Sequence, residues 1–480
     1  MTVFYVLAVI WSIRIVFNLL SYIHLWYVKE YRVDRMLIHL GTKQGKRLLF
    51  LPWRRPPVSP KSLFITIAGL SICVWLYVTL PVFLFLKLFI LDILLFPITM
   101  LLVCVLIIPT ALYHMLLINR AVGKLRAHKK MKVIGITGSY GKTSTKEMLY
   151  TLLSNKYSTL KTEASKNSPI AIAELILTKL RDDHEVLVVE MGAYKIGEIS
   201  HMCRMVQPDI GIVTAVNAQH QDLFGSIENT MKAKYELIEG LDENGVAIIN
   251  ADNEYTRRMA DWVRKDRKKF VLYSVDSLAT FQASRISVTP QGVSFTVEYQ
   301  NQKGIVSVPL LGKHHISNIL AAIAGAVYCG MTFDEAIQAC GEIRTFKKTM
   351  QPVAGCNGSL FIDDTFNNNP DAARAAIDYL ANIGGRKIFV FQPMIELGVY
   401  AEDSHKDVGL YAAKYCDDII LTNDNYLESF LKGVHEVDQL KKATVLSADD
   451  AAAYIRDTVK KDDTVLFKGK ESGRILEKLS

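Results

Sequence analysis

The sequence has few cysteines, and none has the close spacing of a metal or redox motif. Its seven cysteines are an odd number, are scattered over 480 residues and include no C-x-x-C pair. This pattern argues against a disulfide framework and a cysteine-based metal centre, and it suits a reduced cytoplasm. A chain of this length predicts about three domains, with enough residues for large hydrophobic cores.

Charged residues are scarce in the first quarter of the chain, which contains two long apolar blocks. Residues 3–22 are interrupted by Arg14 and Asn18, and residues 63–118 are nearly continuous hydrocarbon. Because a membrane span needs about 20 apolar residues, the second block has room for a helical hairpin. The first block lacks a small-residue cleavage site, which favours an anchor over a signal peptide. We therefore predict a transmembrane region of about three helices at residues 1–120. The polar residues and prolines that interrupt the second block are Pro81, Lys87, Asp92, Pro97 and Pro109.

Positive charge is concentrated beside these apolar blocks, in the loop at residues 27–61 and again at residues 120–132. Nucleic acid is the usual partner of such clusters, but their position beside apolar segments favours membrane lipids and no nucleic acid. The positive-inside rule places the loop in the cytoplasm, and three spans then place Arg120 and everything after it there too. The sequence thus predicts a multi-pass protein of the cell membrane with cytoplasmic catalytic domains. Snorkelling, or a contact between Lys87 and Asp92, accounts for the charges inside the spans without any chemistry.

A glycine-rich turn follows the strand-like run at residues 131–136 and opens a helix-prone stretch at residues 142–155. Backbone N–H groups of such a turn close around a polyphosphate, with the helix N-terminus directed at the negative charge. Lys142 would reach the outer phosphates, and the Thr143 hydroxyl would hold Mg²⁺. A chance glycine-rich turn is the alternative, but the strand–loop–helix context favours an ATP site. Its predicted nucleotide-binding residues are Gly138, Ser139, Gly141, Lys142, Thr143 and Ser144.

Polar residues follow the ends of the next predicted strands, at residues 185–189, 210–215 and 246–250. Glu190 ends the first of these strands, His220 lies just beyond the second, and Lys234 follows in the next helix-like segment. Ligands gather at the carboxyl ends of parallel strands, and a glutamate and a neutral imidazole suit Mg²⁺ beside a polyphosphate. Taken singly, each of these residues is more often a surface or structural residue.

The sequence pattern of the rest of the chain predicts β-hairpins at residues 281–310, followed by a second α/β region. The segment Gly312-Lys313-His314-His315-Ile316-Ser317-Asn318 precedes an alanine-rich helix, for which a plain helix cap is the alternative reading. Strands are predicted at residues 360–363, 387–391, 418–421 and 464–467. The fold class is therefore α/β, with transmembrane helices, a P-loop domain with a parallel sheet and a smaller Rossmann-like domain.

Several of these motifs resemble those of the Mur ligases. The turn has the long form G-x-T-G-x-x-G-K-T of that family. Glu190-Met191-Gly192-Ala193, His220 with Phe224-Gly225-Ser226, and Ala233-Lys234 are similar to its central domain. The run Asp363-Asp364-Thr365-Phe366-Asn367-Asn368-Asn369-Pro370 resembles D-D-S-Y-N-A-N-P. Met394-Ile395-Glu396-Leu397-Gly398 resembles the D-alanyl-D-alanine-adding branch, and Lys468-Gly469 is similar to its late K-G-S.

The resemblance implies a central ATP-binding domain at residues 121–345, a C-terminal domain at residues 346–480 and ATP-dependent amide formation through an acyl phosphate. It implies that Thr143, Glu190, His220 and a carbamylated Lys234 hold Mg²⁺, and that Lys142, Lys234, His220 and Asp364 act in catalysis. It also implies that His314, Asn318 and Asn367 lie near the nucleotide. The partners would be ATP, a carboxylate substrate on a UDP- or lipid-linked peptide, and an amine or dipeptide.

The sequence departs from the family pattern in several places. Lys348-Thr349 replaces a Gly-Arg, His315 replaces an asparagine, and Phe366 lacks a tyrosine hydroxyl. Membrane helices occupy the place of the family's uridine-nucleotide-binding domain. Three hypotheses follow: a cell-wall ligase of the D-alanyl-D-alanine-adding type, a ligase for another polymer (poly-γ-glutamate-like) or a lipid-linked acceptor, and a non-catalytic ATP-binding scaffold.

Overall fold

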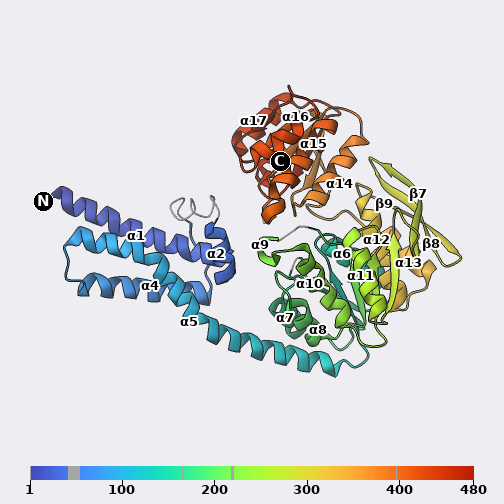
Figure 1. Ribbon diagram of the computed structural model, residues 1–480, viewed down its shortest axis with the longest axis horizontal. Helices are drawn as coiled ribbons and strands as arrows, with labels where there is room; N and C mark the ends of the chain where they lie inside the picture. Colours follow the sequence, from blue (N-terminus) through green and yellow to red (C-terminus); the bar gives the residue numbers. More distant parts are fainter. Residues whose placement is uncertain (1, 42–53, 165, 218–220, 396, 480) are drawn as a thin grey trace. The chain divides into compact units, whose positions relative to one another are not determined.

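A computed structural model describes residues 2–41, 54–164, 166–217, 221–395 and 397–479. The chain divides into two compact units, Met1–Leu117 and Ile118–Ser480 (Figure 1). The regular elements in the described part of the first are all helices, and the second contains two β-sheets. This arrangement agrees with the predicted α/β class.

Long apolar helices form the first unit. Three of its helices are long and apolar enough to cross a membrane, which confirms the helices predicted from the apolar blocks, whereas the crossing itself stays a prediction. Pro81 lies in the turn between the last two helices, and Pro97 and Pro109 lie inside the final one. The helices are α1 (Thr2–Val28), α2 (Val33–Gly41), α4 (Pro60–Thr79) and α5 (Leu84–Ala127), the last of which continues past Leu117.

Polar side chains join α1 to α5 within these apolar segments. The Arg14 guanidinium lies 3.1 Å from Asp92 Oδ2, and Asn18 Nδ2 donates to Asp92 Oδ1 at 3.0 Å. Farther along the two helices, Trp26 Nε1 donates to Thr99 Oγ1 at 3.1 Å. Pairing of this kind lowers the cost of a charge in hydrocarbon and fixes which helix faces meet.

The contact that the sequence suggested for Lys87 is wrong. Its ammonium donates to the Tyr77 carbonyl at 2.9 Å and lies over the Tyr77 ring, whereas Asp92 is held by α1. Residues five apart on a helix point about 140° away from each other around its axis, so Lys87 and Asp92 face different neighbours.

We expect reporter fusions to place Arg55 and the C-terminus on the same cytoplasmic side. The basic residues around the first loop and after α5 motivate this topology. A fusion after Val82, in the turn between α4 and α5, is the matched control and should report the opposite side. A cytoplasmic signal after Val82, or opposite signals at Arg55 and the C-terminus, would refute three spans.

The second unit begins with a nine-stranded sheet in the order β2-β3-β1-β4-β5-β6-β7-β8-β9. Neighbouring strands in the part of this order from β2 to β7 are parallel to each other. Strands β7, β8 and β9 form antiparallel hairpins. The predicted strands of this domain and the predicted hairpins are confirmed to within a few residues. The strands are β1 (Lys132–Thr137), β2 (Thr159–Lys161), β3 (Val186–Glu190), β4 (Ile210–Val213), β5 (Val246–Asn250), β6 (Lys269–Ser274), β7 (Phe281–Thr289), β8 (Gly292–Tyr299) and β9 (Gln302–Val308).

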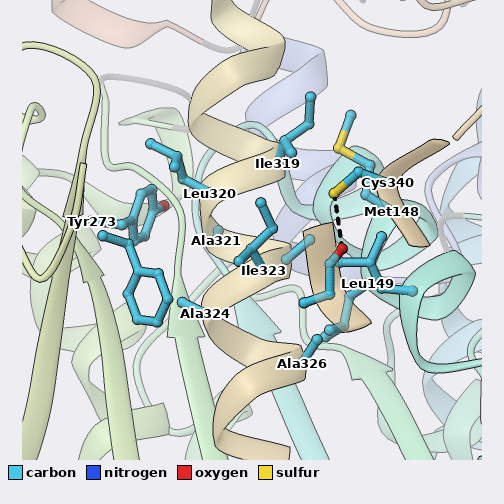
Figure 2. Close-up of a cluster of buried hydrophobic side chains, with 14 of the residues drawn as sticks. Met148, Leu149, Tyr273, Ile319, Leu320, Ala321, Ile323, Ala324, Ala326 and Cys340 are labelled. Carbon is cyan, nitrogen blue, oxygen red and sulfur yellow. Dashed lines mark hydrogen bonds between the residues drawn. The ribbon is translucent and has the colours of Figure 1, made fainter. Parts of the chain in front are cut away.

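Helix α12 (His314–Cys329) lies at the centre of this domain's largest core. Ile319, Leu320 and Ile323 of α12 are buried, as are Met148 and Leu149 of α6 (Figure 2). An alanine-rich helix can pack this closely against strands and a second helix because its side chains are small. The other helices of the domain are α6 (Lys142–Leu153), α7 (Pro169–Lys179), α8 (Glu198–Val206), α9 (Gln221–Phe224), α10 (Ile227–Glu239), α11 (Glu254–Lys265) and α13 (Phe333–Ala339).

A second sheet follows, with the strand order β10-β11-β15-β12-β13-β14. Only β10 runs antiparallel to its neighbour among these described strands. The four strands predicted here are confirmed. The elements are β10 (Gln351–Ala354), β11 (Leu360–Asp364), α14 (Pro370–Ala381), β12 (Lys387–Phe391), α15 (Ala401–Tyr415), β13 (Asp418–Leu421), α16 (Leu427–His435), β14 (Ala443–Val445), α17 (Ala448–Thr458), β15 (Thr464–Lys468) and α18 (Ser472–Leu479).

Candidate active site

The turn between β1 and α6 has a backbone that requires glycine at two positions. Gly138 and Gly141 have φ angles of +150° and +81°. A Cβ atom at Gly138 would lie 2.0 Å from Thr214 Oγ1, and one at Gly141 would lie 2.6 Å from Asn318 Oδ1. Side chains are therefore excluded where the backbone bends, which leaves its N–H groups able to approach a polyphosphate closely.

Lys142 is the first residue of α6, and its side chain turns back over this loop. Its ammonium donates to the carbonyls of Gly138 and Ser139 at 2.7 and 3.0 Å. Burial lowers the pKa of Lys142, and the negative charge of Glu190 acts in the opposite direction. The arrangement holds a positive charge inside the curve of the loop, where a phosphate would need it.

Hydrogen bonds to both carboxylate oxygens hold Glu190 at the end of β3. It is 1% exposed, and its Oε2 accepts hydrogen bonds from Thr143 Oγ1 at 2.9 Å and Lys146 Nζ at 3.2 Å. Its Oε1 accepts from Asn167 Nδ2 at 3.1 Å. The carboxylate and the Thr143 hydroxyl therefore lie side by side at the first turn of α6.

Lys234 lies on α10 and is 3% exposed, with its ammonium 5.6 Å from the centre of the Phe224 ring. Burial, and then the positive charge of Lys142, lower the pKa of Lys234 to about 7. The neighbouring Glu236 accepts hydrogen bonds from backbone N–H groups of Gly197 and Ser200 at the start of α8. Burial thus favours the neutral amine of Lys234 over the ammonium.

The predicted ligand His220 lies outside the described residues. Just before it, Asn217 connects the turn at residues 138–141, here called the phosphate loop, to the second α/β domain. Its backbone N–H donates to Ser139 Oγ at 3.1 Å, and its Nδ2 donates to Asp371 Oδ2 at 2.7 Å and to Asn369 Oδ1 at 3.3 Å. Asn369 caps α14, so this contact joins the loop to a helix N-terminus.

Two of the predicted residues, His314 and Asn318, lie at the start of α12. Asn318 faces the phosphate loop, and its Oδ1 accepts from Thr145 Oγ1 at 3.3 Å. Burial, and then the positive charge of Lys468, lower the pKa of His314 to about 4. His315 is 1% exposed and, within the described part of the chain, neither ring nitrogen has a hydrogen-bond partner.

Asp364 lies with Lys468 at the carboxyl ends of β11 and β15. Its Oδ2 accepts from the Lys468 ammonium at 2.5 Å, and both side chains are buried. The Asn367 side chain turns onto its own chain, with Oδ1 accepting from the Asn368 N–H at 2.9 Å. The structure thus brings together Lys142, Thr143, Glu190 and Asn318 and gives Asp364 a separate ion pair.

Sequence reasoning missed three residues of this site: Lys146, Asn167 and Asn217. Lys146 had a usable signal, because it follows Thr143 by three residues and therefore lies on the same face of α6. Asn167 and Asn217 follow the strands β2 and β4, but nothing local shows which side chains they reach.

The donor set near Glu190 fits a hard divalent cation. A carboxylate and a hydroxyl oxygen beside a phosphate loop are the ligands that Mg²⁺ prefers, together with phosphate oxygens and water. Among the described residues, no group of three or more His, Cys, Asp and Glu side chains is placed to hold a metal.

These features are typical of an α/β protein with a phosphate-binding loop and a second α/β domain. The sequence matches the Mur ligase middle domain over residues 136–326 and the Mur ligase glutamate ligase domain over residues 350–471. The chain belongs to the Mur ligase family.

Curated relatives support this assignment. The chain is 33% identical over 290 residues to UDP-N-acetylmuramoyl-tripeptide–D-alanyl-D-alanine ligase of Escherichia coli K12, covering 59% of this chain and 63% of that protein. It is 28% identical over 354 residues to the Bacillus subtilis ligase of the same name, covering 72% of this chain and 74% of the relative. The chain thus spans less than two thirds of the Escherichia coli relative.

Solved structures agree with the family. A crystal structure of MurF from Acinetobacter baumannii superposes with a TM-score of 0.70 at 26% identity, covering 76% of this chain and 80% of that one. MurF from Thermotoga maritima, solved in complex with ADP, gives a TM-score of 0.67 at 26% identity, covering 76% of this chain and 83% of that one.

Proposed function

We propose that this protein is a membrane-anchored, ATP-dependent ligase that forms an amide bond in cell-wall peptide synthesis, of the D-alanyl-D-alanine-adding type. The observation that carries the proposal is the grouping of Lys142, Thr143 and Glu190 at a glycine-rich phosphate loop, in a chain with both Mur ligase domains. The three apolar helices support a place in the cell membrane, with the two α/β domains in the cytoplasm.

The reaction would proceed in two displacements. A substrate carboxylate oxygen attacks the γ-phosphorus of ATP, and ADP leaves. The amine then attacks the acyl carbon, inorganic phosphate leaves with its bond electrons, and the amine loses a proton. Lys142 would stabilise charge on the transferring phosphoryl group, and the glycine loop would hold the polyphosphate.

Mg²⁺ would be held by Thr143, Glu190, His220 and Lys234 as its carbamate, and it would neutralise charge on the phosphates. The depressed pKa of Lys234 supports the carbamate, because carbon dioxide reacts with the neutral amine. His314, Asn318 and Asn367 are proposed near the nucleotide and Asp364 near the nucleotide or amine. Of these four residues, Asn318 has the strongest support, because it lies against the phosphate loop.

A second candidate carboxylate is one carried on a lipid, or on another polymer such as poly-γ-glutamate. It is favoured by the helical unit Met1–Leu117, which precedes both Mur ligase matches at the place of a uridine-binding domain. A non-catalytic scaffold is disfavoured, because Lys142, Glu190 and Lys234 are all retained although Lys348-Thr349 replaces the family's Gly-Arg.

Purified full-length protein in detergent should release phosphate from ATP only when a carboxylate and an amine are both present. The first pair to test is UDP-N-acetylmuramoyl-tripeptide with D-alanyl-D-alanine, against a glutamate polymer with glutamate as the comparison. Turnover with the second pair alone would replace the cell-wall assignment. Absence of turnover with lipid-linked and soluble carboxylates alike would favour the scaffold.

A further inference from the structure

Lys146 is a charged residue of this site to which the proposed reaction gives no part. It is 0% exposed, so its ammonium has no access to bulk water and needs partners inside the protein. It donates to the Ala164 carbonyl, lies 3.2 Å from Glu190 Oε2 and lies 3.5 Å from Glu147 Oε1. The buried lysine therefore contacts the carboxylate proposed to bind metal.

The direct ion pairs around Lys146 involve two lysines and two glutamates. Glu147 is also bound by the Lys161 ammonium, which comes from β2 and is partly exposed. Two lysines, Lys146 and Lys161, thus face two glutamates, Glu147 and Glu190. Because Lys161 also pairs with Glu147, Lys146 can neutralise Glu190 by direct contact, while Lys142 acts on Glu190 through its charge without a direct ion pair.

The same contacts fix the orientation of the carboxylate. Lys146 and Thr143 approach Oε2 from the same face of α6, and Asn167 holds Oε1. A cation arriving alone would meet a carboxylate whose charge is already cancelled by an ammonium. A cation arriving with ATP brings the negative charge of the polyphosphate with it.

We infer that Lys146 makes divalent-metal binding at Glu190 depend on the nucleotide, by cancelling the glutamate's charge until phosphate oxygens are present. Lys146 is thus a positioning residue that acts through Glu190. The inference rests on the proposed function, since it takes Glu190 as a metal ligand. Its consequence is that free Mg²⁺ would not occupy the site ahead of ATP.

The test is a Mn²⁺ titration of full-length protein, with free Mn²⁺ measured by electron paramagnetic resonance, without nucleotide and with a non-hydrolysable ATP analogue. Wild type should bind Mn²⁺ weakly alone and tightly with the analogue, after the Mn²⁺ that the analogue binds without protein is subtracted. Lys146→Met should bind Mn²⁺ alone about tenfold more tightly or better, because an opposing charge is gone. Lys146→Arg should behave as wild type.

Two further variants control for misfolding and for loss of a lysine outside the site. Lys146→Gln removes the charge but keeps a donor for the Ala164 carbonyl, so it replaces the methionine variant if that protein does not fold. Lys156→Met removes a lysine paired with Glu335 in the same domain, outside this site, and should leave Mn²⁺ binding unchanged.

Glu190→Gln separates the inference from the proposed function. If Glu190→Gln loses nucleotide-supported Mn²⁺ binding while neutral Lys146 variants bind Mn²⁺ alone no better than wild type, the charge-cancelling role is wrong and the metal site stands. If Glu190→Gln binds Mn²⁺ with the analogue as wild type does, Glu190 is not a metal ligand. That result would overturn both the role of Lys146 and the proposed metal site.

Discussion

Lys142→Ala should slow substrate-dependent phosphate release on the order of a hundredfold or more, a loss of ~3 kcal/mol or more of transition-state stabilisation. Lys142 is the only positively charged side chain among the described residues whose ammonium is bonded to the phosphate-loop carbonyls of Gly138 and Ser139. Alanine leaves no cation to meet charge on the transferring phosphoryl group. The measurement is phosphate release by purified protein at saturating ATP, carboxylate and amine.

Lys142→Ala has a second expected effect, on Lys234. The positive charge of Lys142 is one cause of the lowered pKa of Lys234, so its removal should raise that pKa toward the ordinary value for lysine.

For the turnover measurement, Lys156→Ala is the matched control, because it removes a lysine of the same domain that pairs with Glu335. Near wild-type turnover in Lys142→Ala would show that the phosphate loop has been assigned wrongly.

The fold could be predicted from the sequence wherever a local pattern determines it. The apolar run before Gly138 and the helix-prone stretch after Gly141 are neighbours in sequence, so the strand, loop and helix of the phosphate site follow directly. Glu190 was found in the same way, because it ends a buried strand whose neighbours carry ligands at the same edge of the sheet.

Contacts between distant segments could not be predicted. Asn167 donates to Glu190 from 23 residues earlier in the chain, and the local sequence does not show that contact. Arg14 finds Asp92 on a helix that begins 70 residues later in the chain (Leu84 of α5). Sequence proximity suggested Lys87 as the partner of Asp92, but Lys87 lies on another side of α5 and contacts Tyr77.

Two positions at which the sequence departs from the family motifs carry side chains of different chemistry. His315 stands where the family has an asparagine, and it is buried, with its pKa lowered by burial and by His314 while the charge of Asp364 acts in the opposite direction. Lys348 stands at the place of the family's arginine, but a point charge does not supply the paired donors of a guanidinium. A motif match therefore locates the element, and the side chain itself decides the chemistry.

Lys234→Ala should be nearly inactive, and acetate should restore part of the activity. The lysine is buried, and its pKa of about 7 makes the neutral amine available to carbon dioxide. A carbamate supplies oxygen ligands to a hard cation, whereas an ammonium at the same place would repel it. Acetate can occupy the space that alanine vacates and offer equivalent oxygens.

The pH dependence of wild type has a definite sign under this mechanism. Because the pKa of Lys234 is lowered to about 7, the neutral amine increases as pH rises through that value. Activity should therefore rise between about pH 6 and pH 8, and added bicarbonate should increase it most at the low end. In Lys234→Ala with acetate, the response to bicarbonate should be absent.

The alternative role for Lys234 is a cation that binds a phosphate directly. Under that role the protonated form is the active one, so activity should fall as pH rises through about 7. A small amine such as methylamine would then rescue Lys234→Ala, and acetate would not. Lys232→Ala, an exposed lysine two residues away on α10, is the control for loss of charge without loss of the site. Rescue by methylamine alone would remove the carbamate from the mechanism, because only a cationic role needs the ammonium that methylamine supplies.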